Sequence, residues 1–358
     1  MNYKWTLKNT EFTKDKGTVF SCFACGGGST MGYKLAGFDV IGMNEIDPKM
    51  AECYIDNHKP KYSFVEDIRD FVTRDELPEE LYSLDILDGS PPCSSFSMSG
   101  NREKDWGKQK KFREGQAEQT LDDLFFYFID LTKRLKPRVV IAENVKGIIL
   151  GNAIKYAREI YKQFDEAGYY CQHFLLNAAD MGVPQKRERV FFICLRKDLA
   201  EPFLYQKDMF TKIPKLNLVF KEKHIPFKDI LTEETNIHCD KSEKMFPIWE
   251  KWVSLCEPGK DFGSIKHEDK TSKLFNCSKV DNNKPVQTIT AKFDGAGFFT
   301  ESNRHLNLHE LILASSFPLD YNFKNQPGQY ITGMSVPPLM IAKIAQQVYN
   351  QWLSKIIP

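Results

Sequence analysis

Short apolar runs alternate with helix-like patterns along the first 200 residues of the chain. The apolar runs predict strands over residues 18–24, 38–43, 84–87, 139–142, 169–176 and 190–195. Apolar positions at helical spacing predict helices that begin at 29, 47, 121 and 153. Runs as short as 84–87 and 139–142 are typical of strands with both faces buried. The alternation predicts a doubly wound α/β sheet.

Residues at the expected helix ends agree with this pattern. Ser29 or Thr30 is expected to cap the first helix, and Gly37 is expected to end it. Asp47 followed by Pro48 is a favoured start for the second helix, because the first helical position needs no N–H donor.

The pattern changes after residue 200. Residues 201–285 are rich in Lys, Asp, Glu, Asn and Pro and have weak periodicity, which predicts a smaller, less regular domain. Residues 338–353 form an amphipathic pattern that predicts a final helix. A chain of 358 residues exceeds one typical domain, so two domains are expected.

Composition places the chain in a broad class. No apolar run approaches the roughly 20 residues that a membrane span needs, and the polar N-terminus has no signal-peptide stretch. A soluble, cytoplasmic protein without a membrane partner is expected. The net charge of +1 neither demands nor excludes nucleic acid, because a neutral protein can carry one basic face.

The nine cysteines do not predict a disulfide framework, because their number is odd and several lie among apolar residues. Cys22 and Cys25 form a CxxC pair, but no second pair completes a zinc site. No metal site is expected.

A glycine-rich loop, FACGGGSTMG, follows the first predicted strand. Gly26, Gly27 and Gly28 let the backbone turn tightly and approach a ligand closely. Glu45 follows the second predicted strand, where an acid can accept hydrogen bonds from both hydroxyls of a ribose. Together they predict a nucleoside-cofactor site. Gly26, Gly28 and Gly32 also approximate the dinucleotide fingerprint, so a nicotinamide oxidoreductase and a plain tight turn stay open.

A stiff cysteine loop follows the strand predicted over 84–87, at the edge where α/β sheets bind their ligands. Pro91 and Pro92 restrict the backbone just before Cys93. This suits a nucleophile that must meet a carbon atom at a fixed angle. A loop cysteine can equally be structural, so the role of Cys93 depends on its neighbours.

Charged residues accompany two further strands at the same edge. Glu143 follows the strand predicted over 139–142, and Arg187 and Arg189 precede the strand predicted over 190–195. Alternate residues of an extended segment point to one side. Taken singly, Glu143 could cap a helix, and the two arginines could belong to a solvated basic turn.

In this order the motifs resemble those of the DNA cytosine-C5 methyltransferase family, over nearly the whole chain. The matching residues are Phe23-Ala24-Cys25-Gly26-Gly27-Gly28, Glu45 within Asn44-Glu45-Ile46-Asp47, Asp67, Pro92-Cys93, Glu143-Asn144-Val145, Gln185, Arg187, Arg189, Arg304, Leu306, Glu310, Phe317, Pro318 and Gly333-Met334-Ser335-Val336. Each motif alone is weak, but the ordered set is highly specific.

Three positions depart from the family pattern. Cys25 replaces the first glycine of the loop, which affects the path of the loop. Gln119-Thr120-Leu121 replaces an Asp-x-Arg before the helix near 124, and Met334 replaces an asparagine near the cofactor. Cys93, Glu143 and Arg189 are all present.

The resemblance implies the Rossmann-like, doubly wound sheet of S-adenosylmethionine-dependent methyltransferases, with a smaller, irregular target-recognition domain. The catalytic and cofactor-binding domain would comprise residues 1–200 plus 326–358, and the target-recognition domain residues 201–325. Within it, the segment over about 201–300, between the Gln-x-Arg-x-Arg and Arg-x-Leu motifs, would read the DNA sequence.

The resemblance also assigns catalytic roles. Cys93, which follows Pro92, would add to C6 of a cytosine flipped out of the duplex, so that C5 can attack a methyl sulfonium. Glu143 would bond N3 and the exocyclic amine of the ring, and Arg189 would hold O2, with Arg187 as support.

S-adenosyl-L-methionine would be the methyl donor. The residues that the resemblance implies for its binding are Phe23, Gly26, Gly27, Gly28, Glu45, Ile46, Asp67, Ser335 and Val336. Phe23 and Ile46 would lie against the adenine, Glu45 on the ribose and Asp67 near the adenine amine. The glycine backbone would pass the methionine part.

Residues 94–114 follow the cysteine and contain the most basic short stretch of the chain. We expect a mobile loop that closes over the DNA, with phosphates near Arg102, Lys104, Lys108, Lys110 and Lys111. A solvated surface loop is the alternative.

Three other functions stay open at this point. The same fold could act on tRNA. A non-catalytic DNA-binding relative would be expected to have lost Cys93, Glu143 or Arg189. A nicotinamide oxidoreductase would leave Cys93 unexplained. We expect a monomeric bacterial or phage enzyme that acts on double-stranded DNA, with a cognate restriction endonuclease as a functional partner.

Overall fold

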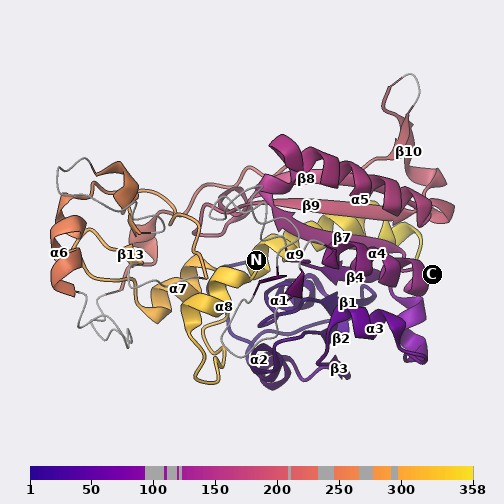
Figure 1. The fold of residues 1–358 in the computed structure, drawn as a ribbon, viewed down its shortest axis with the longest axis horizontal. Helices are drawn as coiled ribbons and strands as arrows, with labels where there is room; N and C mark the ends of the chain where they lie inside the picture. Colours follow the sequence, from indigo (N-terminus) through magenta and orange to yellow (C-terminus); the bar gives the residue numbers. More distant parts are fainter. Residues whose placement is uncertain are drawn as a thin grey trace. The chain divides into compact units, whose positions relative to one another are not determined.

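The computed structural model (Figure 1) describes residues 1–92, 109–110, 119–120, 123–208, 211–232, 246–265, 277–291 and 297–357. Cys93 lies outside the described residues, and so do Arg102, Lys104, Lys108 and Lys111. Lys110 belongs to the short strand β5 (Gln109–Lys110), which pairs with β6 (Gln119–Thr120).

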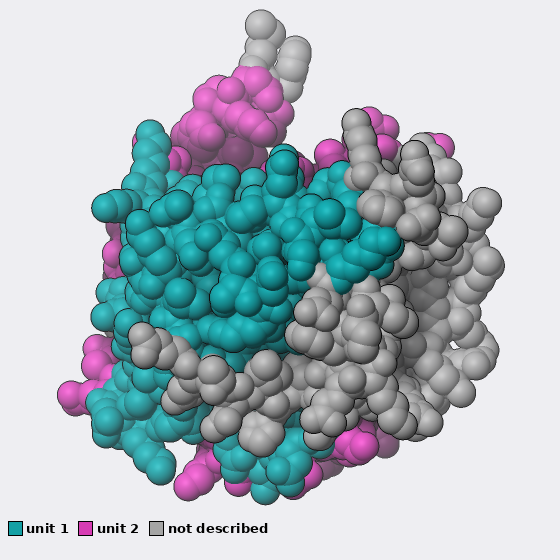
Figure 2. Space-filling view, turned by 90° about the vertical axis from the view of Figure 1, so that its left-hand side faces the viewer, with its two compact units in different colours: residues 1–10, 177–187, 220–340 teal, residues 11–176, 188–219, 341–358 magenta. Residues whose placement is uncertain are grey.

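The chain forms two compact units, which Figure 2 colours separately. Unit 1 comprises residues 1–10, 177–187 and 220–340, and unit 2 comprises residues 11–176, 188–219 and 341–358. The division predicted from the sequence, into a catalytic and a target-recognition domain, is a functional one and stays a prediction.

Unit 2 is built on a seven-stranded sheet in the order β3-β2-β1-β4-β7-β9-β8. The strands are β1 (Thr18–Cys22), β2 (Asp39–Asn44), β3 (Tyr62–Phe64), β4 (Ile86–Gly89), β7 (Val139–Val145), β8 (Tyr169–Asn177) and β9 (Glu188–Arg196). The pairs β1–β2, β1–β4, β2–β3 and β4–β7 are parallel, whereas β9 is antiparallel to β7. The chain starts in the middle of the sheet and builds outward on both sides, so the predicted doubly wound α/β fold is confirmed.

Helices cover both faces of this sheet (Figure 1). The helices are α1 (Gly28–Ala36), α2 (Pro48–His58), α3 (Ile68–Thr73), α4 (Leu124–Leu135), α5 (Ile154–Glu166) and α9 (Pro338–Gln351). Helices α3, α4 and α5 share an apolar core with Phe20, Val140 and Phe192 of the sheet. On the opposite face, α9 contributes Tyr349, whose ring meets Phe38 edge-on at 6.1 Å between centroids.

Unit 2 also carries a two-stranded hairpin, formed by β10 (Leu204–Gln206) and β11 (Lys212–Pro214). Unit 1 is less regular, as the weak periodicity after residue 200 predicts. Its elements are α6 (Phe246–Leu255), α7 (Leu308–Ala314), α8 (Gly328–Met334), β12 (Ser278–Lys279) and β13 (Phe298–Phe299). Among its described residues, one small apolar cluster surrounds Val286 and another surrounds Phe262.

Local sequence signals fix some element ends and miss others. Asp47 accepts a hydrogen bond from the N–H of Lys49 at 2.9 Å and caps α2, as predicted. The predicted cap of α1 is wrong, because neither Ser29 nor Thr30 serves. The cap is Gly27 in a left-handed conformation, since the glycine loop turns directly into the helix.

The predicted end of the strand at 139–142 is also wrong. Strand β7 continues to Val145, so Glu143 and Asn144 lie within it rather than after it. Polar residues can extend a strand at the ligand edge, where one face of the sheet is open to a substrate. Among the described residues, no helix has the length and apolar character of a membrane span.

Candidate active site

The glycine loop joins β1 to α1 at the carboxyl edge of the sheet. Cys25, which replaces the expected glycine, adopts a left-handed conformation (φ 46°), a geometry that costs about 1 kcal/mol for a residue with a Cβ. Its backbone N–H donates to Oε2 of Glu45 at 2.7 Å. This bond holds the loop in the turn that a glycine would otherwise favour.

Gly27 is the position in the loop where a side chain is excluded on two grounds. Its φ is 84°, and a Cβ there would lie 2.2 Å from Nε2 of the buried His58. His58 is neutral, because burial lowers its pKa to about 3. The neutral imidazole therefore occupies the space that a side chain at residue 27 would need.

We expect Gly27→Ala to lower the free energy of unfolding by about 2–4 kcal/mol, from left-handed strain plus the clash with His58. Gly168 is a matched control, because its φ is 90° and a Cβ there meets nothing within 4 Å. Gly168→Ala should cost about 1–2 kcal/mol, from the strain alone. Urea denaturation of both variants measures the difference. Equal losses would contradict the role given to His58.

Glu45 is buried at the end of β2, where its two carboxylate oxygens accept backbone N–H groups. The N–H of Cys25 donates to one oxygen at 2.7 Å, and the N–H of Asp47 donates to the other at 2.8 Å. Burial raises the pKa of Glu45. Each carboxylate oxygen has a second lone pair, so hydroxyl groups of a ligand can donate to the same group.

The other predicted cofactor residues of unit 2 lie around this edge. Phe23 is half-buried, with its ring 6.4 Å from that of Phe128 in α4. Ile46 is half-buried directly after β2. Asp67 caps α3 and also binds Arg69, whose Nη1 donates to Oδ2 at 2.9 Å.

The prolines of the cysteine loop leave β4 at the same edge. Nδ2 of Asn144 in β7 donates to the carbonyl oxygen of Pro91 at 3.1 Å. A Cβ on Gly89 would lie 2.5 Å from Cε2 of Phe128, so the strand end is also packed tightly against α4. The described part of the loop, through Pro92, is therefore held from two sides just before Cys93.

Glu143 and Arg189 form an ion pair between the neighbouring strands β7 and β9. Nε of Arg189 donates to Oε1 of Glu143 at 2.9 Å, and the two side chains are only 11% and 15% exposed, Glu143 first. The register of β7 and β9 pairs Glu143 with Phe191 and Val145 with Arg189, which puts both side chains on one face. Desolvation lowers the pKa of Arg189, while Glu143 opposes that shift.

Arg187 lies in unit 1, and its guanidinium is buried there. Nη1 donates to the carbonyl oxygen of Ile289 at 3.0 Å, and Nη2 donates to that of Gly333 at 2.9 Å. These bonds join three segments of unit 1 that are distant in the sequence. Arg187 thus has a supporting role within unit 1 that spacing alone did not reveal.

The C-terminal motifs also lie in unit 1. Arg304 pairs with the fully buried Glu310 at 2.6 Å, so the Arg-x-Leu…Glu motif forms an internal ion pair. Ser335 and Val336 are buried after α8. Oγ of Ser335 has no hydrogen-bond partner among the described residues.

A buried acid that was not predicted from the sequence also lies at this edge. Asp88 of β4 is 2% exposed and accepts hydrogen bonds from Oγ of Ser21 at 2.7 Å and from the hydroxyl of Tyr33 at 3.0 Å. The signal in the sequence is the position of Asp88, which comes directly after the strand predicted over 84–87. An acid is rarely buried unless it has partners.

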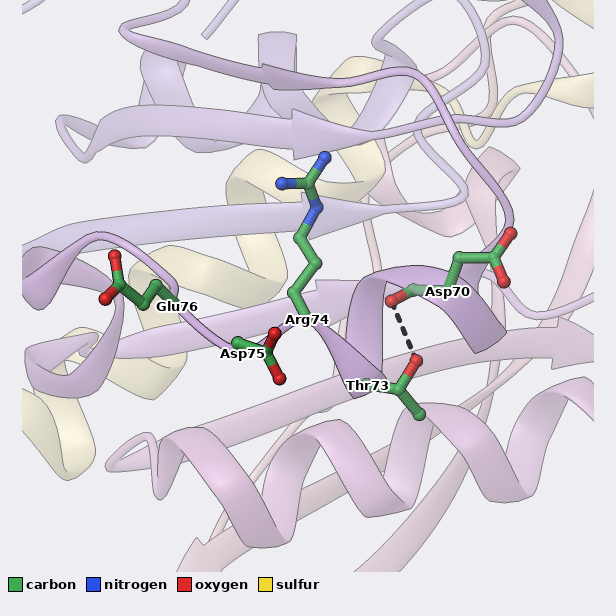
Figure 3. Close-up of a pocket in the computed structure, with 5 residues that line it drawn as sticks. All are labelled: Asp70, Thr73, Arg74, Asp75 and Glu76. Atoms are coloured by element: carbon green, nitrogen blue, oxygen red, sulfur yellow. Dashed lines mark hydrogen bonds between the residues drawn. The ribbon is translucent and has the colours of Figure 1, made fainter.

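A separate surface hollow is lined by Asp70, Thr73, Arg74, Asp75 and Glu76 (Figure 3). Oγ1 of Thr73 donates to the carbonyl oxygen of Asp70 at 3.1 Å, and Arg74 pairs with Glu66 at 2.6 Å. The hollow follows the C-terminal end of α3, whereas the predicted site residue Asp67 caps its N-terminal end. It contains none of the predicted site residues.

The model of the C-5 cytosine-specific DNA methylase family matches residues 17–350. The chain belongs to this family. The predicted family is thereby confirmed, and the match decides against the nicotinamide oxidoreductase that the glycine loop alone left open.

Several relatives of this methylase are bacterial Type II methyltransferases. M.DdeI of Desulfomicrobium norvegicum is 34% identical over 378 aligned positions, which cover 92% of the chain and 88% of the relative. M1.HphI of Haemophilus parahaemolyticus is 29% identical over 347 residues, with 92% and 86% covered. The match to M.FnuDI of Fusobacterium nucleatum is 38% identical, but it spans about half of each chain (51% and 47%).

Solved structures share the fold of this methylase. A mutant of DNMT2 from Spodoptera frugiperda has a TM-score of 0.62 at 16% identity, with 93% of this chain and 99% of that chain covered. The S. pombe Dnmt2 methyltransferase has a TM-score of 0.60 at 14% identity, with 96% and 99% covered. The predicted methyltransferase fold is confirmed.

Proposed function

We propose that the chain transfers a methyl group from S-adenosyl-L-methionine to C5 of a cytosine in a specific sequence of double-stranded DNA, through a covalent adduct with Cys93. The observation that carries this proposal is the Glu143–Arg189 pair, which lies on one face of the neighbouring strands β7 and β9. A carboxyl group and a guanidinium held together in this way complement the polar edge of a cytosine ring.

The reaction needs help at two carbon atoms, because C6 is a poor electrophile and C5 is a poor nucleophile. The thiolate of Cys93 forms a bond to C6, and C5 gains electron density. C5 can then take the methyl group of a sulfonium donor, whose bond between sulfur and that methyl group breaks as the new carbon–carbon bond forms. A proton held between the carboxyl group of Glu143 and N3 neutralises the negative charge that develops on the ring, Glu143 also accepts from the exocyclic amine, and Arg189 donates to O2. A base then removes the proton from C5, the bond between sulfur and C6 breaks, and the thiolate is restored.

The residues of unit 2 fit S-adenosylmethionine, which supplies the methyl sulfonium when bound. Gly27 has a φ of 84°, and a side chain there would collide with His58, so the loop needs glycine for its tight turn. Glu45 can accept from ribose hydroxyls while it holds the backbone of Cys25. The half-buried Phe23 offers an aromatic surface for the adenine. The cofactor contacts of Gly26, Gly28, Ile46, Asp67, Ser335 and Val336 stay predictions from the sequence.

We further propose a role in restriction and modification, because the relatives M.DdeI and M1.HphI are named Type II methyltransferases. The enzyme would act as a monomer on DNA in the cytoplasm. A cognate endonuclease would be a functional partner, since methylation would protect the host DNA from cleavage.

Bisulfite sequencing tests the proposed function directly. DNA and tRNA would be isolated from a host that lacks cytosine-C5 methylation and expresses the chain, with an empty vector as control. We expect protection of one cytosine within one short DNA sequence. Methylation of tRNA without methylation of DNA would instead support the tRNA enzyme. Unmodified DNA and tRNA, from cells that contain the folded protein, would overturn the proposal.

A further inference from the structure

Asp88 is a buried titratable group that the proposed chemistry does not use. Its carboxylate points to the face of the sheet opposite the α3–α5 core, because it pairs in register with Ser21 of β1 while Leu87 lies in that core. Within the described residues, its hydrogen-bond partners are the hydroxyls of Ser21 and Tyr33, and no ion pair reaches it. Burying an acid without a cation is costly, so its retention requires an explanation.

The two hydroxyls connect Asp88 to both sides of the glycine loop. Ser21 lies on β1, next to the last residue of the strand that leads into the loop, and Tyr33 lies on α1, the helix that leaves it. Asp88 itself precedes Pro91 by three residues. One carboxylate therefore links the two elements that flank the glycine loop with strand β4, which leads into the cysteine loop.

We propose that Asp88 is a positioning residue that sets the offset between the cysteine loop and the glycine loop, and that it does so best when its carboxylate is ionised. The proposal rests on the proposed function, because that offset determines how C5 of the cytosine meets the methyl sulfonium. An error of about 1 Å at such a contact can cost on the order of 10²-fold in rate.

The hydrogen-bonding pattern explains why the charge matters. An ionised carboxylate accepts from both hydroxyls at once, and charge-assisted bonds of this kind are shorter and stronger than neutral ones. When a proton binds, one oxygen becomes a donor, so Ser21 or Tyr33 must turn to accept and one link weakens. The protonated network holds the two loops less firmly.

The surroundings of Asp88 shift the protonation of its carboxylate toward the neutral pH range. Burial raises the pKa of Asp88 to about 7, the two hydroxyls oppose that shift, and the charge of Glu143 adds to it. The other titratable groups that the carboxylate influences are Cys22 on β1, Tyr33 on α1 and Tyr54 on α2, whose pKa values are raised mainly by burial. Those three groups stay protonated near neutrality, and Arg189 reaches the region through its pair with Glu143.

The test compares wild type with Asp88→Asn, which keeps the size of the side chain but cannot ionise. Single-turnover methyl transfer would be measured from about pH 6 to 8.5, on duplexes that carry the sequence mapped by bisulfite sequencing. We expect a rate ratio, wild type over variant, near 1 at the acidic end and about tenfold at the alkaline end. Steps common to both proteins cancel in this ratio. The dissociation constant for S-adenosylmethionine should change by less than about threefold.

Asp85→Asn is the matched control. Asp85 is a second buried acid on the approach to β4, but it lies at the opposite edge of the sheet, where it pairs with Arg138 and accepts from the N–H of Thr18 at 2.7 Å. Its replacement should lower the midpoint of thermal unfolding and leave the rate ratio near 1 at every pH. Above pH 7, Asp88→Asn should raise the rate ratio without lowering the midpoint of thermal unfolding, because it removes an uncompensated buried charge.

Tyr33→Phe provides a second variant that keeps the acid. It removes one hydroxyl, and because that hydroxyl lowers the pKa of Asp88, the pH at which the rate rises should move upward. A flat ratio for Asp88→Asn together with an unmoved pH profile for Tyr33→Phe would overturn the inference, while the wild-type rate would leave the proposed function intact. If Asp88→Asn does not fold, the Tyr33→Phe profile decides alone. An inactive wild type would instead refute the proposed function.

Discussion

Cys93→Ser is expected to lower turnover by at least about 10³-fold and to leave the affinity for S-adenosylmethionine almost unchanged. The reason is the acidity of the attacking group, because a hydroxyl is far less ionised than a thiol at neutral pH and adds poorly to C6 of a pyrimidine. The proposed binding of the methyl donor uses the glycine loop and Glu45 and gives no role to the sulfur atom of Cys93, so we expect this affinity to persist in the variant. Methyl incorporation and calorimetry measure the two quantities.

Covalent trapping gives a second measurement of the same prediction. Wild type should form a denaturation-resistant adduct with duplexes that contain 5-fluorocytosine, because fluorine at C5 cannot leave as a proton does. Cys93→Ser should form none. Cys171→Ser is the control for loss of a thiol, since Cys171 is a half-buried residue of β8 and takes no part in the proposed site. A Cys93→Ser enzyme of near-normal rate would overturn the covalent route.

Sequence patterns predict those parts of the fold that depend on residues close together in the sequence. The apolar runs of β1, β7 and β9 and the Asp47–Pro48 helix start depend on residues only a few positions apart. Strand β3 and helix α3, of three and six residues, were not predicted, because they are too short to show a period. Their existence depends on the sheet edge against which they pack.

The buried acid and the contacts that the sequence did not reveal depend on partners far away in the sequence. Asp88 binds Ser21 and Tyr33, at separations of 67 and 55 residues. Arg187 binds carbonyl groups 102 and 146 residues away, so no local spacing distinguishes it from Arg189. The motif predicts both arginines as one basic pair. In the structure Arg187 donates to backbone carbonyls of unit 1, and Arg189 pairs with a carboxylate of unit 2.

Because Arg189 pairs with a buried carboxylate, we expect a large effect from Arg189→Ala. The change leaves Glu143 without its guanidinium at a position where both side chains are mostly buried. We expect the free energy of unfolding to fall by about 3–5 kcal/mol, the usual cost of breaking a buried pair from one side. Activity should fall by about 10²–10³-fold, because the proposed donor to O2 of the cytosine and the ionic partner of Glu143 are lost together.

Lys146→Ala is the matched control for this prediction. Lys146 follows β7 directly and pairs at 3.1 Å with Glu188, the first residue of β9, but both side chains are about 40% exposed (39% and 41%). An exposed pair contributes at most about 1 kcal/mol, so its loss should be small. Urea denaturation and methyl-transfer assays would compare both variants with Arg189→Lys. The lysine variant keeps the positive charge but loses the planar guanidinium, so it shows how much of the effect is due to charge alone. If Arg189→Ala were no more harmful than Lys146→Ala, the ion pair would be an ordinary surface contact, and the arrangement that supports cytosine binding would lose its main element.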